Sequence, residues 1–346
     1  MKWGLFYKMD LTTTIPELKL PVVKKALTSL FDHNEVEDIQ LLTGGLSSAL
    51  VYRITIESKN YLLRILMHAD EMHNPERQHI CMGLAASANI APHVYYSNDE
   101  DALAITDFVQ AKPLREGFAS KQELVTALSN TIKAIHALPP FPKLVNFLDG
   151  VDIFIQQFKE LNMFPEHITA EYFSLYAEIQ KSYPRHDTDL VASHNDLNPN
   201  NILFDGKQIW VIDWEAAFQN DRYVDLTILA QPYVNDEQDE AIYLQTYFGA
   251  ALDEYKKARF FLMQQICRMY YAMIMLRFAA AQKPTNYTHD ANMNQPEMAE
   301  FGAMLMSGKI LLDTYEGKLQ YGKILLNTML SAMKTERFKA AIKTMD

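Results

Sequence analysis

The chain has 346 residues, 49% of them apolar, and carries a net charge of −11 at pH 7. This length and apolar content exclude a disordered chain and predict two lobes with sizeable cores, while the acidic balance argues against general nucleic-acid binding. The chain has only two cysteines, and its longest apolar stretch, residues 260–281, is interrupted by polar and charged side chains, so we expect a cytoplasmic protein without disulfides or a membrane span.

Strand patterns dominate the first 107 residues. A helix is expected over residues 16–31, where Pro16 stands near the start and apolar residues recur on one face. A second helix is expected over residues 75–88. Runs rich in β-branched and aromatic residues, bounded by turn residues, predict strands at residues 39–42, 49–56, 61–66, 93–96 and 102–105.

Helical patterns dominate the chain from about residue 121 onward. We expect helices over residues 121–137, 150–161, 168–182, 238–247, 252–281 and 297–334. A strand-rich part followed by a helical part predicts an α+β fold. We therefore predict two lobes, residues 1–107 with a nucleotide-binding sheet and residues 108–346 with the catalytic and acceptor regions, joined by a hinge near residues 107–113.

A β-hairpin is expected inside the helical half. Two apolar runs, residues 202–204 and 209–212, are separated by a four-residue turn that begins with Asp-Gly. Asp-Gly between apolar runs is a strong hairpin signal. Because a hairpin brings its two ends together, Asp196 and Asn201 are expected to lie beside Asp213.

The residues around this hairpin have the chemistry that phosphoryl transfer needs. The spacing H-x-D-x-x-x-x-N, from His194 to Asn201, followed by a hairpin and Asp213, matches the catalytic loop and metal-binding Asp of kinases in order. Asp196 can accept the proton of an attacking hydroxyl, and Asn201 and Asp213 can offer oxygen ligands to Mg²⁺. His194 is expected to brace the loop through hydrogen bonds. The alternative is a polar turn in which Asp196 is only a cap.

A family resemblance is carried by the segment SHNDLNPNNILFDGKQIWVIDWEAA. It resembles the catalytic loop of the choline/ethanolamine kinase and aminoglycoside phosphotransferase group, with Asp-Trp-Glu where protein kinases have Asp-Phe-Gly. The resemblance extends over residues 38–230 and implies a bilobal protein-kinase-like fold with ATP and Mg²⁺ as cofactors. By position, it implies that Asp196 is the catalytic base and that Asn201 and Asp213 bind Mg²⁺.

The same resemblance implies a nucleotide site. Residues 42–48 would form the nucleotide loop, although the two glycines of this loop fit an ordinary turn equally well. Arg64 stands where many members carry a phosphate-binding lysine, and Glu76 would be its ion-pair partner, with Glu71 as a rival. Backbone groups of residues 106–109 would face the adenine. The candidate nucleotide-binding residues are Gly44, Gly45, Ser47, Ser48, Arg64, Glu76, Asp107, Phe108 and Val109.

The acceptor is expected to be a small cationic molecule, because aromatic faces with a nearby carboxylate recognise ammonium groups. Arg64 and the Asp-Trp-Glu segment favour choline, ethanolamine or a similar amino-alcohol. Asp225 matches an Asp that braces the catalytic loop in the resembling group. Two alternatives stay open, an aminoglycoside or other amino-sugar phosphotransferase and a catalytically silent nucleotide-binding pseudokinase. The candidate acceptor-binding residues are Trp214, Glu215, Tyr233 and Tyr270.

Overall fold

The structure is a computed structural model that describes residues 11–42, 49–185 and 189–345. It contains a five-stranded sheet in the N-terminal part and mostly helices in the C-terminal part, which confirms the expected α+β class. The hinge expected near residues 107–113 stays a prediction. By compactness, the chain divides into two units, Met1–Lys143 with Val191–Gln219 and Leu144–Leu190 with Asn220–Asp346.

The first unit contains an antiparallel sheet with the strand order β1-β2-β3-β5-β4. All five strands were expected from the sequence, with ends that differ by two residues at most. The β2–β3 turn lies at Glu57 and Ser58, which both have positive φ angles of 50° and 63°, as a two-residue hairpin turn requires. The strands are β1 Asp38–Leu41, β2 Leu50–Ile56, β3 Lys59–Ile65, β4 Val94–Asn98 and β5 Leu103–Asp107.

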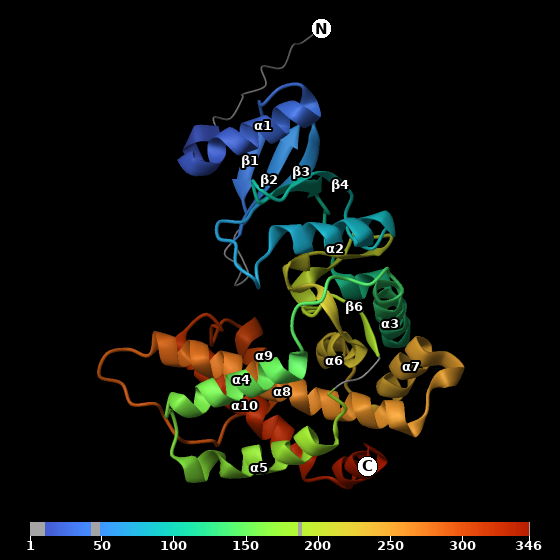
Figure 1. The fold of residues 1–346 in the computed structure, drawn as a ribbon, viewed down its shortest axis with the longest axis vertical. Coiled ribbons are helices and arrows are strands. Elements are labelled where there is room, and N and C mark those ends of the chain that lie inside the picture. The colour runs from blue at the N-terminus through green and yellow to red at the C-terminus, as the bar shows by residue number, and fades with distance from the viewer. Residues whose placement is uncertain (1–10, 43–48, 186–188, 346) are drawn as a thin grey trace. The chain divides into compact units, whose positions relative to one another are not determined.

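The core of this sheet lies on the face that packs against α1 (Leu20–Phe31), which runs across the strands in Figure 1. Successive side chains of a strand point to opposite faces. In β3, Leu63 and Ile65 are fully buried in this core, together with Leu27 of α1. Arg64 stands between them in sequence, so its side chain lies on the opposite face of the sheet. The side chain of Arg64 therefore points away from the apolar core.

The expected hairpin is confirmed. It is formed by β7 (Ile202–Phe204) and β8 (Ile209–Val211), with Ile202 opposite Val211. Gly206 lies in its turn with φ +98°, a conformation that side chains with a Cβ rarely adopt. Strands β6 (Leu190–Ser193) and β9 (Phe218–Asp221) pair with each other and bracket the hairpin in sequence. The remaining helices of the first unit are α2 (Pro75–Ser87) and α3 (Lys121–His136).

The second unit is a helical assembly around α8 (Glu254–Gln282), and its neighbours α4 and α10 are visible beside it in Figure 1. Helix α10 approaches α8 closely at Gly322, where an added Cβ would lie 2.7 Å from the Cγ of Leu276. A larger residue there would force the two helices apart. The other helices are α4 Phe147–Glu160, α5 Glu166–Ser182, α6 Arg222–Tyr233, α7 Glu237–Phe248, α9 Met298–Met306, α10 Tyr315–Met333 and α11 Glu336–Met345.

One expectation for this unit was wrong. Residues 297–334 were expected to form one helix, but the structure has two helices, α9 and α10, with a break between them. The helix α9 ends at Met306, and Gly308 follows with φ +69°. A positive φ cannot continue a right-handed helix. The sequence signal was the small pair Ser307-Gly308, a common helix stop.

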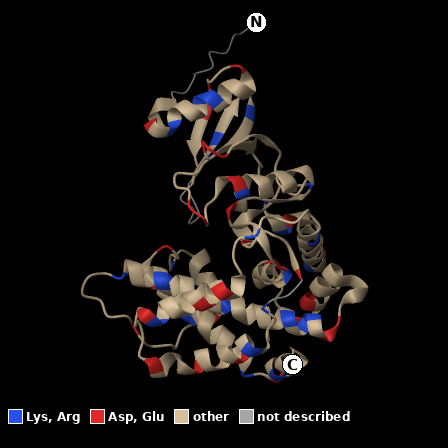
Figure 2. Ribbon diagram, viewed as in Figure 1, with Lys and Arg blue, Asp and Glu red and all other residues tan. Residues whose placement is uncertain are grey.

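Charged residues of both signs are interspersed along the helices, as Figure 2 shows. Among the described residues, none of the helices is both long enough and apolar enough to cross a lipid bilayer.

Candidate active site

The carboxylate of Asp196 is held by two side-chain amides of the same loop. The Nδ2 of Asn198 donates to its Oδ1 at 3.1 Å, and the Nδ2 of Asn201 donates to its Oδ2 at 3.0 Å. Asn201 also donates to the backbone carbonyl of Asp196 at 2.8 Å. Leu197, between them, is fully buried and anchors the loop. The plane of the Asp196 carboxylate is therefore fixed from both sides.

His194 is buried behind this loop. Its Nδ1 accepts a hydrogen bond from the backbone N–H of Asp196 at 3.3 Å, and its Nε2 lies 2.9 Å from the carbonyl oxygen of Ile212. Since Nδ1 acts as the acceptor and a carbonyl can only accept, the proton must be on Nε2. The imidazole thus connects the backbone of Asp196 to the residue that precedes Asp213.

Asn201 and Asp213 are brought together by the ends of the hairpin, as the sequence predicted. The backbone N–H of Ile212 donates to the carbonyl of Asn201 at 3.0 Å. Asp213 itself has a left-handed conformation with φ 63° and ψ 69°. Such strained backbone in a residue other than glycine concentrates at functional sites. The spatial cluster of Asp196, Asn201 and Asp213 therefore exists within a single unit.

Arg64 of β3 forms ion pairs with the two acidic residues that follow β8. Its guanidinium lies 3.1 Å from Asp213 and 2.6 Å from Glu215. Burial raises the pKa of the Asp213 carboxyl, and the nearby charge of Glu215 raises it further, whereas Arg64 lowers it. The site thus gathers two carboxylates, of which Asp213 is costly to ionise, and one cation, which can balance only one of the two negative charges.

The donor atoms of this cluster fit a magnesium ion bound together with a nucleotide. Both amide protons of Asn201 are used by Asp196, so its Oδ1 is the end that remains for a metal. Within the described ranges, no group of three or more His, Cys, Asp or Glu side chains could hold a metal ion alone. Mg²⁺ commonly takes one or two protein oxygens and completes its shell with phosphates and water. Asn201 and Asp213 match that pattern.

Sequence reasoning missed Arg77, which connects α2 to this cluster. The side chain is buried and donates to the carbonyl of Glu215 at 2.9 Å, to that of Glu71 at 2.9 Å, and to that of Met72. Burial lowers the pKa of its guanidinium. Cys81, one turn later, donates from its Sγ to the carbonyl of Ala217 at 3.7 Å. No motif signals such arginine-to-carbonyl contacts, because their acceptors are backbone atoms.

The expected nucleotide residues fall into three groups. Gly44, Gly45, Ser47 and Ser48 lie outside the described residues. Glu76 is exposed in the first turn of α2, and its pairing with Arg64 stays a prediction. Asp107 is the last residue of β5. Its carboxylate accepts a hydrogen bond from the hydroxyl of Tyr95 and lies 2.9 Å from the Nζ of Lys59. Half-exposed Phe108 and Val109 follow the strand, and their contact with adenine stays a prediction.

The expected acceptor residues are divided between the two units. In the first unit, Trp214 is buried against His194, at a ring distance of 4.7 Å, and Glu215 is paired with Arg64. In the second unit, Tyr233 is buried in α6, and Tyr270 of α8 packs against Phe147 and Phe154. Their roles toward an acceptor stay predictions.

Asp225, the expected bracing residue, is fully buried in the first turn of α6. Tyr243 lies near it. Burial raises the pKa of the Tyr243 hydroxyl, and the charge of Asp225 raises this pKa further. Its effect on the catalytic loop stays a prediction.

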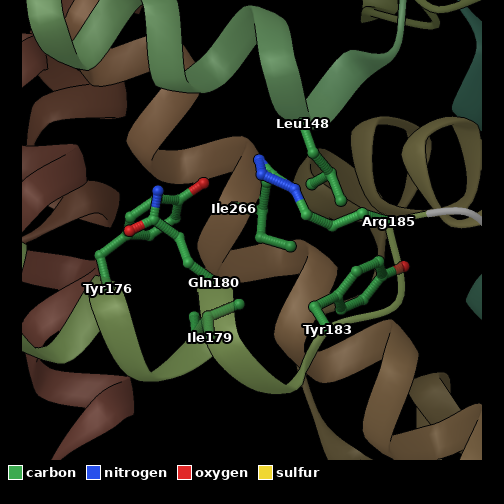
Figure 3. A pocket seen from close by; sticks show the side chains of 7 residues that line it. All are labelled: Leu148, Tyr176, Ile179, Gln180, Tyr183, Arg185 and Ile266. Carbon is green, nitrogen blue, oxygen red and sulfur yellow. The ribbon is translucent and has the colours of Figure 1, made fainter.

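A small pocket with a volume of about 10 Å³, room for about one water molecule, lies among α4, α5 and α8 of the second unit. In Figure 3, Arg185 extends across it from one side, while Ile179 and Ile266 form apolar walls. The charge of Arg185 is already compensated by Asp152. The lining therefore combines apolar walls with a satisfied ion pair, and it contains none of the residues of the Asp196 cluster.

Comparison with known families gives a match over most of the chain. The profile of the phosphotransferase enzyme family (APH) matches residues 38–261. Among curated proteins, the chain is similar to Protein LicA homolog of Mycoplasma capricolum subsp. capricolum, with 32% identity over 133 residues. This match covers 38% of the chain and 52% of the relative, so the chain spans about half of that protein's length.

Crystal structures of two proteins share the fold. One is a choline/ethanolamine kinase family protein from Mesorhizobium loti, with a TM-score of 0.62, 15% identity, and coverage of 94% of this chain and 99% of that one. The other is spectinomycin phosphotransferase APH(9)-Ia, determined with ADP and spectinomycin, with a TM-score of 0.59, 14% identity, and coverage of 93% and 100%. At these identities the similarity shows the fold, and it confirms the expected kinase-like architecture.

Proposed function

The chain belongs to the phosphotransferase enzyme family, and we propose that it transfers the γ-phosphate of ATP to a hydroxyl group of choline, ethanolamine or a similar amino-alcohol. The observation that carries this proposal is the cluster of Asp196, Asn201 and Asp213 around the hairpin. One base and two oxygen ligands at these positions are what a kinase requires. A protein that only bound nucleotide would not need an oriented carboxylate at Asp196.

The proposed chemical step gives each of these side chains a role. The acceptor oxygen attacks the γ-phosphorus, the bond from this phosphorus to the β,γ-bridging oxygen breaks, and the hydroxyl proton passes to a carboxylate oxygen of Asp196. Asn201 and Asp213 would hold the magnesium ion, which supplies charge neutralisation on the phosphates when it is bound. Arg64 carries the remaining positive charge and is suited to bidentate contact with phosphate oxygens.

The amino-alcohol is favoured by two observations. The Glu215 carboxylate lies beside Asp213, so the proposed metal site has a second negative charge next to it, which suits a cationic acceptor. The fold is also shared with the choline/ethanolamine kinase family protein from Mesorhizobium loti. A second candidate is an amino-sugar acceptor, because the spectinomycin phosphotransferase shares the fold nearly as well.

An acceptor screen tests the proposal. The purified protein is incubated with Mg²⁺-ATP and, in separate reactions, choline, ethanolamine and several aminoglycosides, and acceptor-dependent ADP release is measured. We expect release with an amino-alcohol. Release only with aminoglycosides would show that the acceptor is an amino-sugar, and the proposed type of reaction would stand. Nucleotide binding without transfer to any acceptor would point to the silent pseudokinase and overturn the proposed function.

A further inference from the structure

Asn198 is fixed at both ends of its side-chain amide. Its Oδ1 accepts a hydrogen bond from the backbone N–H of Asn200 at 2.9 Å, and its Nδ2 donates to the Oδ1 of Asp196 at 3.1 Å. A backbone N–H can only donate, so the amide oxygen must face Asn200. The amide nitrogen then faces Asp196. The orientation of Asn198 is thus determined by its partners, without any choice between the two ends of the amide.

The local sequence explains why Asn198 reaches the carboxylate. A proline at the next position disfavours helical backbone for the residue before it. Asn198 accordingly has extended angles, φ −70° and ψ 161°, and caps the short 3₁₀ turn η4 (Pro199–Asn201). Its carbonyl also accepts the backbone N–H of Asn201 at 3.0 Å. One residue therefore links the turn that carries the proposed metal ligand to the side chain of the proposed base.

We propose that Asn198 is a positioning residue that holds the Asp196 carboxylate in the orientation needed for proton transfer, an inference that rests on the proposed function. Asn201 fixes one carboxylate oxygen and Asn198 fixes the other. Each carboxylate oxygen has two acceptor sites, so one site per oxygen remains for an acceptor hydroxyl. Without Asn198, the carboxylate would be held through Oδ2 and the backbone alone and would rotate more freely about its side-chain bonds.

A purely structural role of Asn198 can be separated from this positioning role. Ser and Thr are both good N-cap residues that add no charge beside Asp196, so Asn198→Ser and Asn198→Thr preserve the cap that accepts the N–H of Asn200. Neither variant has an amide nitrogen to donate to Asp196. If Asn198 only capped the turn, both variants would keep full activity. If it positions the base, both variants lose activity while the loop stays folded.

The matched control is Asn200→Ser in the same loop. Asn200 is exposed, and its contact with Asn198 uses its backbone N–H and not its side chain. We expect Asn198→Ser and Asn198→Thr to lower kcat by about 10- to 100-fold, since small displacements of a reacting group cost up to about 100-fold. The KM for ATP should change by less than about threefold, because binding of the nucleotide does not use this contact. Asn200→Ser should keep the wild-type kcat.

Crystal structures of the wild type and of Asn198→Ser give a second measurement that does not depend on any acceptor. We expect the Asp196 carboxylate to leave its wild-type orientation in the variant while η4 is retained. An unchanged carboxylate, or a wild-type kcat in both cap-preserving variants, would overturn the positioning role. Absence of transfer by the wild type itself would instead overturn the proposed function, and the pair of crystal structures would still decide the orientation.

Discussion

Arg64 of β3 and Glu215 lie 2.6 Å apart, and this ion pair joins the sheet to the segment that carries the proposed metal ligand. The same guanidinium lies 3.1 Å from Asp213. Arg64 therefore provides a positive charge beside both carboxylates.

Replacement of Arg64 by Met should weaken nucleotide binding. Charge-assisted hydrogen bonds contribute about 1.5–3 kcal/mol, so we expect the KM for ATP to rise by about tenfold or more. Arg64→Lys should lose less, because it keeps the charge but not the bidentate geometry. The control is Arg53→Met on the neighbouring strand, whose ion pair with Asp38 spans 2.7 Å. An unchanged KM in Arg64→Met would show that this arginine does not contact the nucleotide.

Replacement of Asp196 by Asn or Ala should lower the rate of transfer strongly and leave nucleotide binding intact. A general base contributes about 10²–10⁴-fold to the rate, and we expect kcat to fall by that amount. Calorimetric titration with Mg²⁺-ATP should give a dissociation constant close to that of the wild type. A near-normal kcat in either variant would mean that another group accepts the proton.

Replacement of Arg77 by Met should destabilise the first unit. The side chain is 5% exposed, and its removal would leave the carbonyls of Glu71, Met72 and Glu215 without this donor. Each unsatisfied buried polar group costs about 1–3 kcal/mol, so we expect a loss of about 3 kcal/mol in the free energy of unfolding, measured with urea. Arg115→Met, at an exposed position, should change the stability by less than about 0.5 kcal/mol.

Arg259 should be equally important to the second unit. Its guanidinium is 1% exposed and lies 2.7 Å from Asp221 and 3.3 Å from Asp189. Removal of one partner from a buried ion pair typically costs about 3–5 kcal/mol, so Arg259→Met should be destabilising by that amount in urea. The control is Lys257→Met on the same helix, whose exposed pair with Glu254 should contribute less than about 1 kcal/mol. Equal stability of the two variants would contradict this role.

Asp205 in the hairpin turn gives a test by pH. Hydrogen bonds from the Trp210 side chain and from the backbone N–H of Gln208 lower the pKa of the Asp205 carboxyl below its ordinary value of 3.8. A lowered pKa in the folded state means that the carboxylate stabilises the fold above the unfolded-state value, and that this contribution disappears as the pH falls through the lowered pKa.

The wild type should therefore be more stable than Asp205→Asn at pH 7, and the difference should shrink below about pH 4. Thermal unfolding of both proteins across this range measures it. A difference that stays constant down to pH 2 would show that the carboxylate charge does not matter to the turn.

Much of the site was predictable because it depends on local sequence. The Asp-Gly turn predicted the hairpin, and the hairpin predicted that Asn201 and Asp213 would be neighbours. The backbone hydrogen bond from the N–H of Ile212 to the carbonyl of Asn201 confirms this prediction. The ion pairs of Arg64 were not predicted, because they join residues about 150 positions apart in sequence. Such contacts depend on how the sheet packs, which no spacing rule describes.

The helices show the same limit of prediction from sequence patterns. Helix α6 was not expected, because its buried residues run continuously from Tyr223 to Ala230 and so lack the periodic pattern of an amphipathic helix. By contrast, α3 was expected within one residue of its observed end, since it alternates buried and exposed faces after a Ser120 cap. Periodicity identifies a helix only where one of its sides meets water.

Each unit is built from two separate segments of the sequence, and their order has a consequence for biosynthesis. Residues 191–219 complete the first unit, but residues 144–190 of the second unit are translated before them. On the ribosome, the first unit therefore cannot be completed until an unfinished part of the second unit has been synthesised. Elongation at about 5–20 residues per second makes this interval several seconds long. During this interval the first unit still lacks the segment that carries Asp196 and Asp213, so we expect the nascent chain to be most prone to aggregation then.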